Sequence, residues 1–131
     1  MSDIAEMTLV ELAAGLKAGR FSSREVADTF LARIAKADGK LHSFVEVYTK
    51  EARALADAAD LARGTGLPLP ALHGLPIAIK DLCDIEGRVG TGGSKMLEKR
   101  VATETSATVE RLLASGMVPL GKTHMVEFAF G

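Results

Sequence analysis

The sequence has 131 residues, which is the length of one ordinary domain and enough to bury a sizeable core. Hydrophobic residues make up 47% and charged residues 25%, a composition typical of a soluble globular protein and not of a disordered one. The 16 basic and 17 acidic side chains give a net charge of -1, so no overall basic excess points to nucleic acid.

Targeting and redox signals are sparse. The N-terminal residues are acidic and lack an apolar signal core, and no apolar run is long enough to cross a bilayer. The single cysteine, Cys83, has no partner for an internal disulfide, which fits a reducing compartment. We therefore expect a cytoplasmic location and no membrane contact. The apolar ending at Phe128 to Gly131 is unusual for a domain terminus and suggests part of a larger fold.

The first half of the sequence is predicted to be mainly helical. Thr8 with Glu11, and Ser22 with Glu25, match the capping box that begins a helix. The first helix should end near Gly19 and the second near Gly39, and a third, alanine-rich helix should run from about Thr49 to Arg63. The apolar stripes of the first two helices are Leu9, Leu12, Ala13 and Leu16, and Val26, Ala27, Phe30, Leu31 and Ile34. Each stripe needs an apolar surface to cover.

Strand patterns alternate with these helices. Residues 44–48 alternate in strand fashion, residues 77–80 form a short apolar strand, and residues 82–85 are a candidate for another. Thr105 or Ser106 should begin a helix with Val109, Leu112 and Leu113 inward, and Gly116 should end it. Residues 117–120 are a buried-strand candidate, for which Pro119 favours an edge or strand-end position. Strands alternating with helices predict an α/β fold with some parallel pairing.

Lys80 stands where the apolar strand stops. Side chains alternate along a strand, so Ile77 and Ile79 should share one face while Ala78 and Lys80 share the other. Lys80 would then leave the sheet beside a small neighbour, which gives other groups room to approach its amine. A charged residue at the end of a strand is usually only solvated, so this pattern alone assigns no role to Lys80.

The glycine-rich stretch from Gly90 to Lys95 does not fit a nucleotide site. In the phosphate-binding loop the lysine precedes the hydroxyl residue, whereas here Ser94 precedes Lys95. Lys95 also stands where the dinucleotide fingerprint needs its third glycine. The stretch is therefore interpreted as a flexible turn or as backbone that lines a pocket.

The remaining reactive residue types are scattered. The histidines at positions 42, 73 and 124 lack a second ligand at metal spacing, so no metal site is expected. Cys83 as a nucleophile with His73 as its base is an alternative, but a lone cysteine beside an apolar strand is usually packed and unreactive.

From His73 onward the sequence resembles the amidase signature family. Residues 72–81, which read LHGLPIAIKD, resemble the family's lysine strand, and Thr91 to Ser94 resemble its small-residue loop. Residues 106–112 resemble the helix that follows, and residues 120–131 its next strand and turn. Four blocks in the family's order are more specific than any one of them. His124 departs from the pattern, because that position is often asparagine in the family.

The resemblance implies the N-terminal portion of the amidase-signature fold, with helices packed on a mixed β-sheet and incomplete as given. It implies one partial domain over residues 1–131, with 1–63 mainly helical and 72–131 carrying the lysine strand. In this family a serine, a second serine in a cis peptide and a lysine form the catalytic triad. By resemblance, Lys80 is the catalytic lysine and Lys122 has a structural or pocket-edge role, while Thr91, Gly92 and Phe128 line one wall of the substrate site. The lysine must be neutral to accept a proton, and desolvation against the apolar strand is the available cause.

The function implied is the N-terminal segment of an amide hydrolase that acts on a small-molecule amide and needs no cofactor. Both serines of the triad lie beyond the matched blocks, so we expect this chain to be inactive by itself. Two alternatives stay open. One is the A subunit of a glutamyl- or aspartyl-tRNA amidotransferase, the case in which a nucleic-acid partner is expected. The other is a non-catalytic fragment that self-associates as a homo-oligomer through an unpaired sheet edge.

Overall fold

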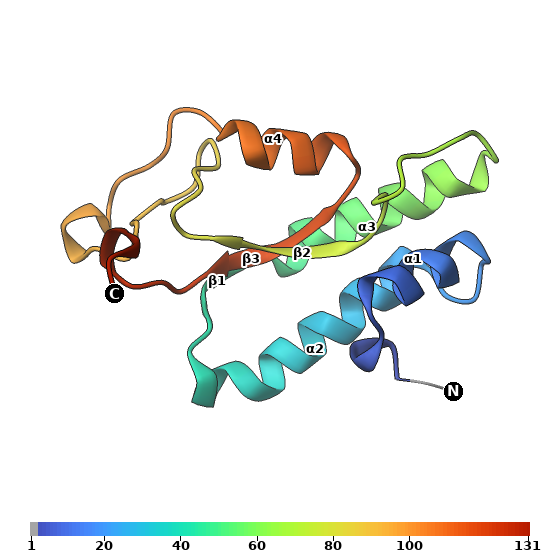
Figure 1. Cartoon of the computed structure of the whole chain (residues 1–131), viewed down its shortest axis with the longest axis horizontal. Coiled ribbons are helices and arrows are strands. Elements are labelled where there is room, and N and C mark those ends of the chain that lie inside the picture. Colours follow the sequence, from blue (N-terminus) through green and yellow to red (C-terminus); the bar gives the residue numbers. More distant parts are fainter. Residues whose placement is uncertain (1–2) are drawn as a thin grey trace.

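The computed structural model describes residues 3–131 of the chain, which form helices packed on a three-stranded mixed sheet (Figure 1). The helices are α1 (Leu9–Lys17), α2 (Ser23–Leu41), α3 (Thr49–Gly64) and α4 (Ala107–Ala114), and the strands are β1 (Phe44–Val47), β2 (Pro76–Lys80) and β3 (Val118–Thr123). Three short 3₁₀ turns, η1 (Ile4–Glu6), η2 (Lys95–Leu97) and η3 (Glu127–Ala129), complete the elements. The predicted α/β class is confirmed.

Both predicted capping boxes form. The Thr8 hydroxyl accepts from the Glu11 N–H at 3.3 Å, and the Glu11 carboxylate accepts from the Thr8 N–H at 2.7 Å. The same reciprocal pair joins Ser22 and Glu25. Each box satisfies N–H groups that the first turn of a helix leaves without partners, so the sequence alone specifies where α1 and α2 begin.

The core lies between the helices and β3. One cluster of buried side chains joins α2, α3 and β3, and a second joins α1, α2 and the segments that lead into β2 and β3. The first contains Ala27, Leu31, Ala52, Ala56, Val118 and Leu120, and the second contains Leu12, Leu16, Val26, Leu75 and Met117. The apolar stripe predicted for α2 therefore faces the core. In Figure 1, α1 and α2 lie below the strands and α4 lies above them.

The sheet has the order β1-β3-β2. β2 and β3 are parallel and are connected through α4, and their register runs from Pro76 opposite Val118 to Lys80 opposite Thr123. β1 pairs with β3 in the antiparallel sense. The C-terminal ends of β2 and β3 therefore lie side by side, and the chain leaves both strands at the same edge of the sheet.

Two of the sequence expectations are wrong in detail, and a third is confirmed in one of its two alternatives. Residues 82–85 form no strand, because the chain turns directly after β2 and the Cys83 N–H donates to the Lys80 carbonyl at 2.9 Å. Leu113 is exposed, whereas Val109 of the same helix is buried. Pro119 is the second residue of β3, so the predicted strand-end position is confirmed, although β3 is the central strand and not an edge. Proline is tolerated there because the β1 pairing reaches only Gly121, so Pro119 has a strand partner on one side only.

Gly121 lies where the three strands come closest together. A Cβ atom at this position would be 2.2 Å from the Glu46 carbonyl oxygen of β1, and that neighbour is backbone that cannot rotate away. The register with β2 also shifts here, because Ala78 pairs with Gly121 while Ile77 pairs with Pro119. Glycine is thus required for β1 to approach β3 at normal hydrogen-bonding distance.

Gly121→Ala is expected to lower the free energy of unfolding by about 2 kcal/mol or more, because β1 must move away from β3 to admit the methyl group. Gly39→Ala is the matched control, since a Cβ on that α2 residue meets nothing within 4 Å. The control should stabilise the chain by about 0.5 to 1 kcal/mol. Urea denaturation of both variants measures the difference, and equal stabilities would contradict the close approach.

Candidate active site

Lys80 is the last residue of β2, and its side chain leaves the sheet on the exposed face. Ile79 is buried while Ala78 and Lys80 are exposed, as the strand alternation predicts. Among residues 3–131, no hydrogen bond or ion pair to the Lys80 side chain is formed. The predicted direction of Lys80 is confirmed, whereas the apolar strand by itself does not enclose the amine.

Asp81 is the residue that organises the surroundings of Lys80. Its side chain is buried, and its Oδ1 accepts from the Lys122 Nζ at 3.2 Å. The same carboxylate accepts from the Thr91 N–H at 3.3 Å and from the Thr91 hydroxyl. The backbone N–H of Asp81 donates to Thr123 and its carbonyl accepts from Gly92, both at 3.2 Å. Asp81 thereby joins β2, β3 and the loop that begins at Thr91.

The sequence assigned no role to Asp81, although a signal was available. An aspartate directly after a strand-ending lysine, and a second lysine at the end of the next strand, are the components of an ion pair across a parallel sheet. Lys122 is fully buried and forms its ion pair with Asp81. Of the two roles predicted for Lys122, structural or pocket-edge, these contacts favour the structural one.

The loop from Thr91 to Ser94 is held against the C-terminal segment. The Gly92 carbonyl accepts from the Phe128 N–H at 2.7 Å, and the Ser94 hydroxyl donates to Glu127 at 2.5 Å. Gly92 has φ +57°, and a Cβ there would contact the Phe128 ring at 3.4 Å, so the ring packs over the glycine. The structure therefore brings Thr91, Gly92 and Phe128, the three predicted substrate-site residues, into one cluster.

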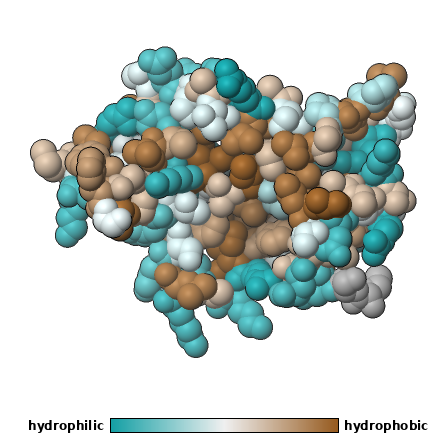
Figure 2. All heavy atoms as spheres, viewed as in Figure 1, coloured by the Kyte–Doolittle hydropathy of each residue, from teal (hydrophilic) through white to brown (hydrophobic). Residues whose placement is uncertain are grey.

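Thr91, Gly92 and Phe128 differ in the groups that they expose at the surface. The Thr91 hydroxyl donates to Asp81 and accepts from the Gly93 N–H at 3.0 Å, so its described contacts lie inside the loop. Phe128 is 47% exposed and sits in the left-handed region with φ 50°. The outer surface of this cluster is accordingly the Gly92 backbone beside an exposed aromatic ring. Figure 2 shows hydrophobic side chains at the C-terminal turn, where Val126 and Phe130 are also exposed.

A hollow of about 530 Å³ lies beside Asp81 and Thr91. Arg88 reaches into it, forms ion pairs with Glu46 and Glu51, and places its guanidinium 4.5 Å from the centre of the Tyr48 ring. Tyr48 is 3% exposed, and its hydroxyl has no hydrogen-bond partner among the described residues. Burial, assisted by the Glu46 carboxylate and opposed by Arg88, raises the pKa of Tyr48 to about 12.

The sequence contains one tyrosine and no tryptophan, so tyrosinate absorbance reports on Tyr48 alone. The pKa of Tyr48 rises from 10.0 to about 12 on folding, so the folded chain should lose stability as the pH climbs from 10 through 12. Tyrosinate should appear together with the loss of circular dichroism, and near pH 10 in denaturant. Arg88→Met removes the cation that favours the tyrosinate, so the folded chain should lose more stability over the same pH range and unfold at lower pH. Ionisation near pH 10 with the fold intact would contradict the burial of the hydroxyl.

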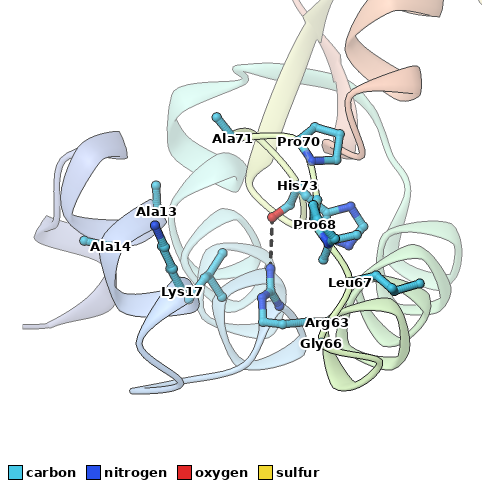
Figure 3. A pocket seen from close by; sticks show the side chains of 12 residues that line it. Ala13, Ala14, Lys17, Arg63, Gly66, Leu67, Pro68, Pro70, Ala71 and His73 are labelled. Carbon is cyan, nitrogen blue, oxygen red and sulfur yellow. Dashed lines mark hydrogen bonds between the residues drawn. The ribbon is translucent and has the colours of Figure 1, made fainter.

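A second hollow, of about 730 Å³, lies between α1, the end of α3 and the loop at 66–73 (Figure 3). Arg63 points into it and donates to the His73 carbonyl oxygen at 3.0 Å, and it also donates to Ser23 and Asp60. These three acceptors tie α2, α3 and the loop together. Neither hollow is lined by Lys80, and this one contains His73 but not Thr91, Gly92 or Phe128.

No group of three or more metal-ligating side chains occurs within residues 3–131. Over the same residues, no helix has the length and apolar character that a membrane crossing requires.

Comparison with known proteins places the chain in a family. The family model described as Amidase matches residues 25–131. The A subunit of the glutamyl-tRNA(Gln) amidotransferase of Chromohalobacter salexigens is 50% identical over 126 residues, covering 96% of this chain and 26% of the relative. The corresponding protein of Alcanivorax borkumensis, which has the same name, is 51% identical over 128 residues, covering 95% of this chain and 26% of the relative.

Solved structures agree. A structure described as a vestigial protein complex related to an s-triazine catabolic enzyme has a TM-score of 0.91 and 43% identity, covering 95% of this chain and 28% of that chain. The peptide amidase of Stenotrophomonas maltophilia has a TM-score of 0.86 and 30% identity, covering 95% of this chain and 26% of that chain. The chain thus spans about 26% of the length of the curated relatives it matches. With the lysine strand, the small-residue loop and the mixed sheet in the arrangement described, this chain belongs to the amidase family.

Proposed function

We propose that this chain is the lysine-bearing N-terminal part of an amide hydrolase, with Lys80 as the proton acceptor. The observation that carries the proposal is that Asp81, the residue after Lys80, is hydrogen-bonded to the loop at Thr91 and Gly92. Lys80 ends β2 directly beside Asp81, and Asp81 holds the loop whose Gly92 contacts Phe128. The base and the wall proposed for the substrate site are thereby joined in a chain of the amidase family.

The proposed reaction proceeds through an acyl-enzyme. A serine hydroxyl attacks the amide carbonyl carbon, and its proton passes through a second serine to the neutral amine of Lys80. The tetrahedral intermediate collapses, the C–N bond breaks, and the leaving nitrogen takes up the proton as ammonia or an amine. Water then attacks the acyl-enzyme with the same proton path and releases the carboxylic acid. Backbone N–H groups would stabilise the oxyanion.

Two requirements of this chemistry are not met by residues 3–131. The amine of Lys80 must be uncharged, yet Lys80 is exposed, so its desolvation has to come from groups packed onto this face from elsewhere. The two serines must also come from elsewhere, because Ser94 and Ser106 match other positions of the family. We therefore propose that the 131-residue chain is inactive by itself.

Lys80→Met tests the assignment in an active protein that carries this segment joined to the remainder of an amidase. Loss of the proton acceptor should lower kcat/KM by about 10³-fold or more, because removing one triad member leaves little residual catalysis. Lys50→Met, which removes another exposed lysine from α3, should leave the rate unchanged. Near-normal hydrolysis by the Lys80 variant would remove this residue from the mechanism. Amide turnover by the purified 131-residue chain that Lys80→Met abolishes would refute the proposed inactivity.

The amidotransferase subunit is a second candidate, supported by the names of the curated relatives at 50% and 51% identity. Such an enzyme would use the same lysine to release ammonia from glutamine. His124 and the ending Phe128 to Phe130 favour a free-standing amidase instead. Glutaminase activity that appears only with partner subunits would decide for the amidotransferase, and hydrolysis of simple amides without partners would decide for the amidase.

Self-association is a further candidate for the chain alone. β1 and β2 are both edge strands, and Val45 and Val47 of β1 are 44% and 37% exposed. Exposed apolar edge strands favour pairing with another chain. Sedimentation of the purified chain as a monomer over a wide concentration range would count against this candidate.

A further inference from the structure

Asp81 and Lys122 form an ion pair in which both side chains are 1% exposed. Burying two opposite charges gives little net stability, and apolar replacements of similar volume are often neutral or stabilising. Stability alone is therefore a weak reason for this pair. The position of the pair offers a better reason. Asp81 follows Lys80 in sequence, and Lys122 precedes Thr123, the cross-strand partner of Lys80.

The pair is also hydrogen-bonded to the loop that begins at Thr91. Asp81 accepts from the N–H and the hydroxyl of Thr91, and its carbonyl accepts from Gly92. Gly92 in turn accepts from the Phe128 N–H. A continuous chain of hydrogen bonds thus runs from Lys122 through Asp81 and the loop to Phe128, and Lys80 lies one residue from its centre.

We propose that Asp81 and Lys122 are a positioning pair for the amide hydrolysis. They fix the end of β2, and with it Lys80, relative to the loop that carries Gly92 and Phe128. Their opposite charges also compensate each other, so that the base experiences no net charge from them. This inference rests on the proposed role of Lys80 as the proton acceptor.

Other charged groups approach the pair and must be considered with it. Glu46, Arg88 and Glu98 line the same hollow as Asp81, and the charge of Asp81 acts on Tyr48. Lys122 acts on Asp84, which is itself paired with Arg100. Glu46 and Arg88 pair with each other. Substitutions confined to Asp81 and Lys122 leave these groups unchanged, so differences between such variants report on the two members of the pair.

The single variants should move the pH dependence in opposite directions in the active protein. Asp81→Asn leaves the Lys122 cation without its partner, which favours the neutral amine of Lys80, so the acid limb of kcat/KM should move to lower pH. Lys122→Met leaves the Asp81 carboxylate uncompensated, which favours the protonated amine, so the limb should move to higher pH. Shifts in the same direction, or no shift, would overturn the compensating role.

The double variant, Asp81→Asn with Lys122→Met, covers the case in which a single variant fails to fold. It leaves no buried charge, so its thermal stability should stay near that of the parent. Its acid limb should return towards the parent position, while kcat falls tenfold or more because the loop has lost its ionic anchor. Unchanged kcat in a folded double variant would overturn the inference. If the double variant is normal while Lys80→Met is inactive, this inference fails alone; if Lys80→Met is active, the proposed function fails.

The 131-residue chain provides a readout that does not need activity. In the double variant, amide hydrogen exchange at Thr91 should speed up tenfold or more, because its N–H donates to the Asp81 carboxylate that the variant removes. Exchange at Tyr48, whose N–H donates to the Leu120 carbonyl at 2.9 Å, is the internal control and should not change. Unaltered protection of Thr91 would show that the Asp81 side chain does not hold the loop.

Discussion

The buried ion pair between Asp81 and Lys122 is the constraint on which the arrangement of the site depends. Neither charge reaches water, so each needs the other as its partner. They meet only because Ile79 is opposite Lys122 in the parallel register, which places Asp81 beside the Lys122 side chain. A shift of that register by one residue would send Lys122 to the other face of the sheet and leave Asp81 buried without its cation. The register of β2 against β3 therefore also determines the position of Lys80.

Local signals explain the parts of the fold that the sequence predicted well. The hydroxyl and carboxylate of each capping box are three residues apart, so Thr8 with Glu11 and Ser22 with Glu25 need no tertiary information. The direction of Lys80 follows equally from strand geometry, because alternation decides which face it occupies once Ile79 is buried. The grouping of Thr91, Gly92 and Phe128 came from the family resemblance and not from spacing, since the loop and the C-terminal segment are distant in sequence.

Features set by tertiary contacts were the ones that local reasoning missed. For Pro119 an edge and a strand-end position were both open, and the choice of the strand end in a central strand depends on β1, which ends before reaching it. Residues 82–85 looked like a strand, but the Asp81 carboxylate is turned inward and the chain bends directly after it. Asp81 itself was overlooked since its importance depends on Lys122, 41 residues away in sequence. No window of local pattern contains both members of that pair.

If Lys80 is the proton acceptor, as proposed, its exposure separates two requirements of that role: its position and its removal from water. Position is supplied within this chain, by a buried frame of β2, β3 and the loop at Thr91. Desolvation of the Lys80 amine is not supplied by the described residues, because Ala78 and Lys80 both lie on an exposed face of β2. An amine in water is protonated near neutral pH and accepts no proton, so a lysine that is only positioned is not yet a base. On the proposed mechanism, the small side chain of Ala78 leaves room for enclosing groups to approach the Lys80 amine. Closure of that face would then bring the serines and the dry environment together in a single step.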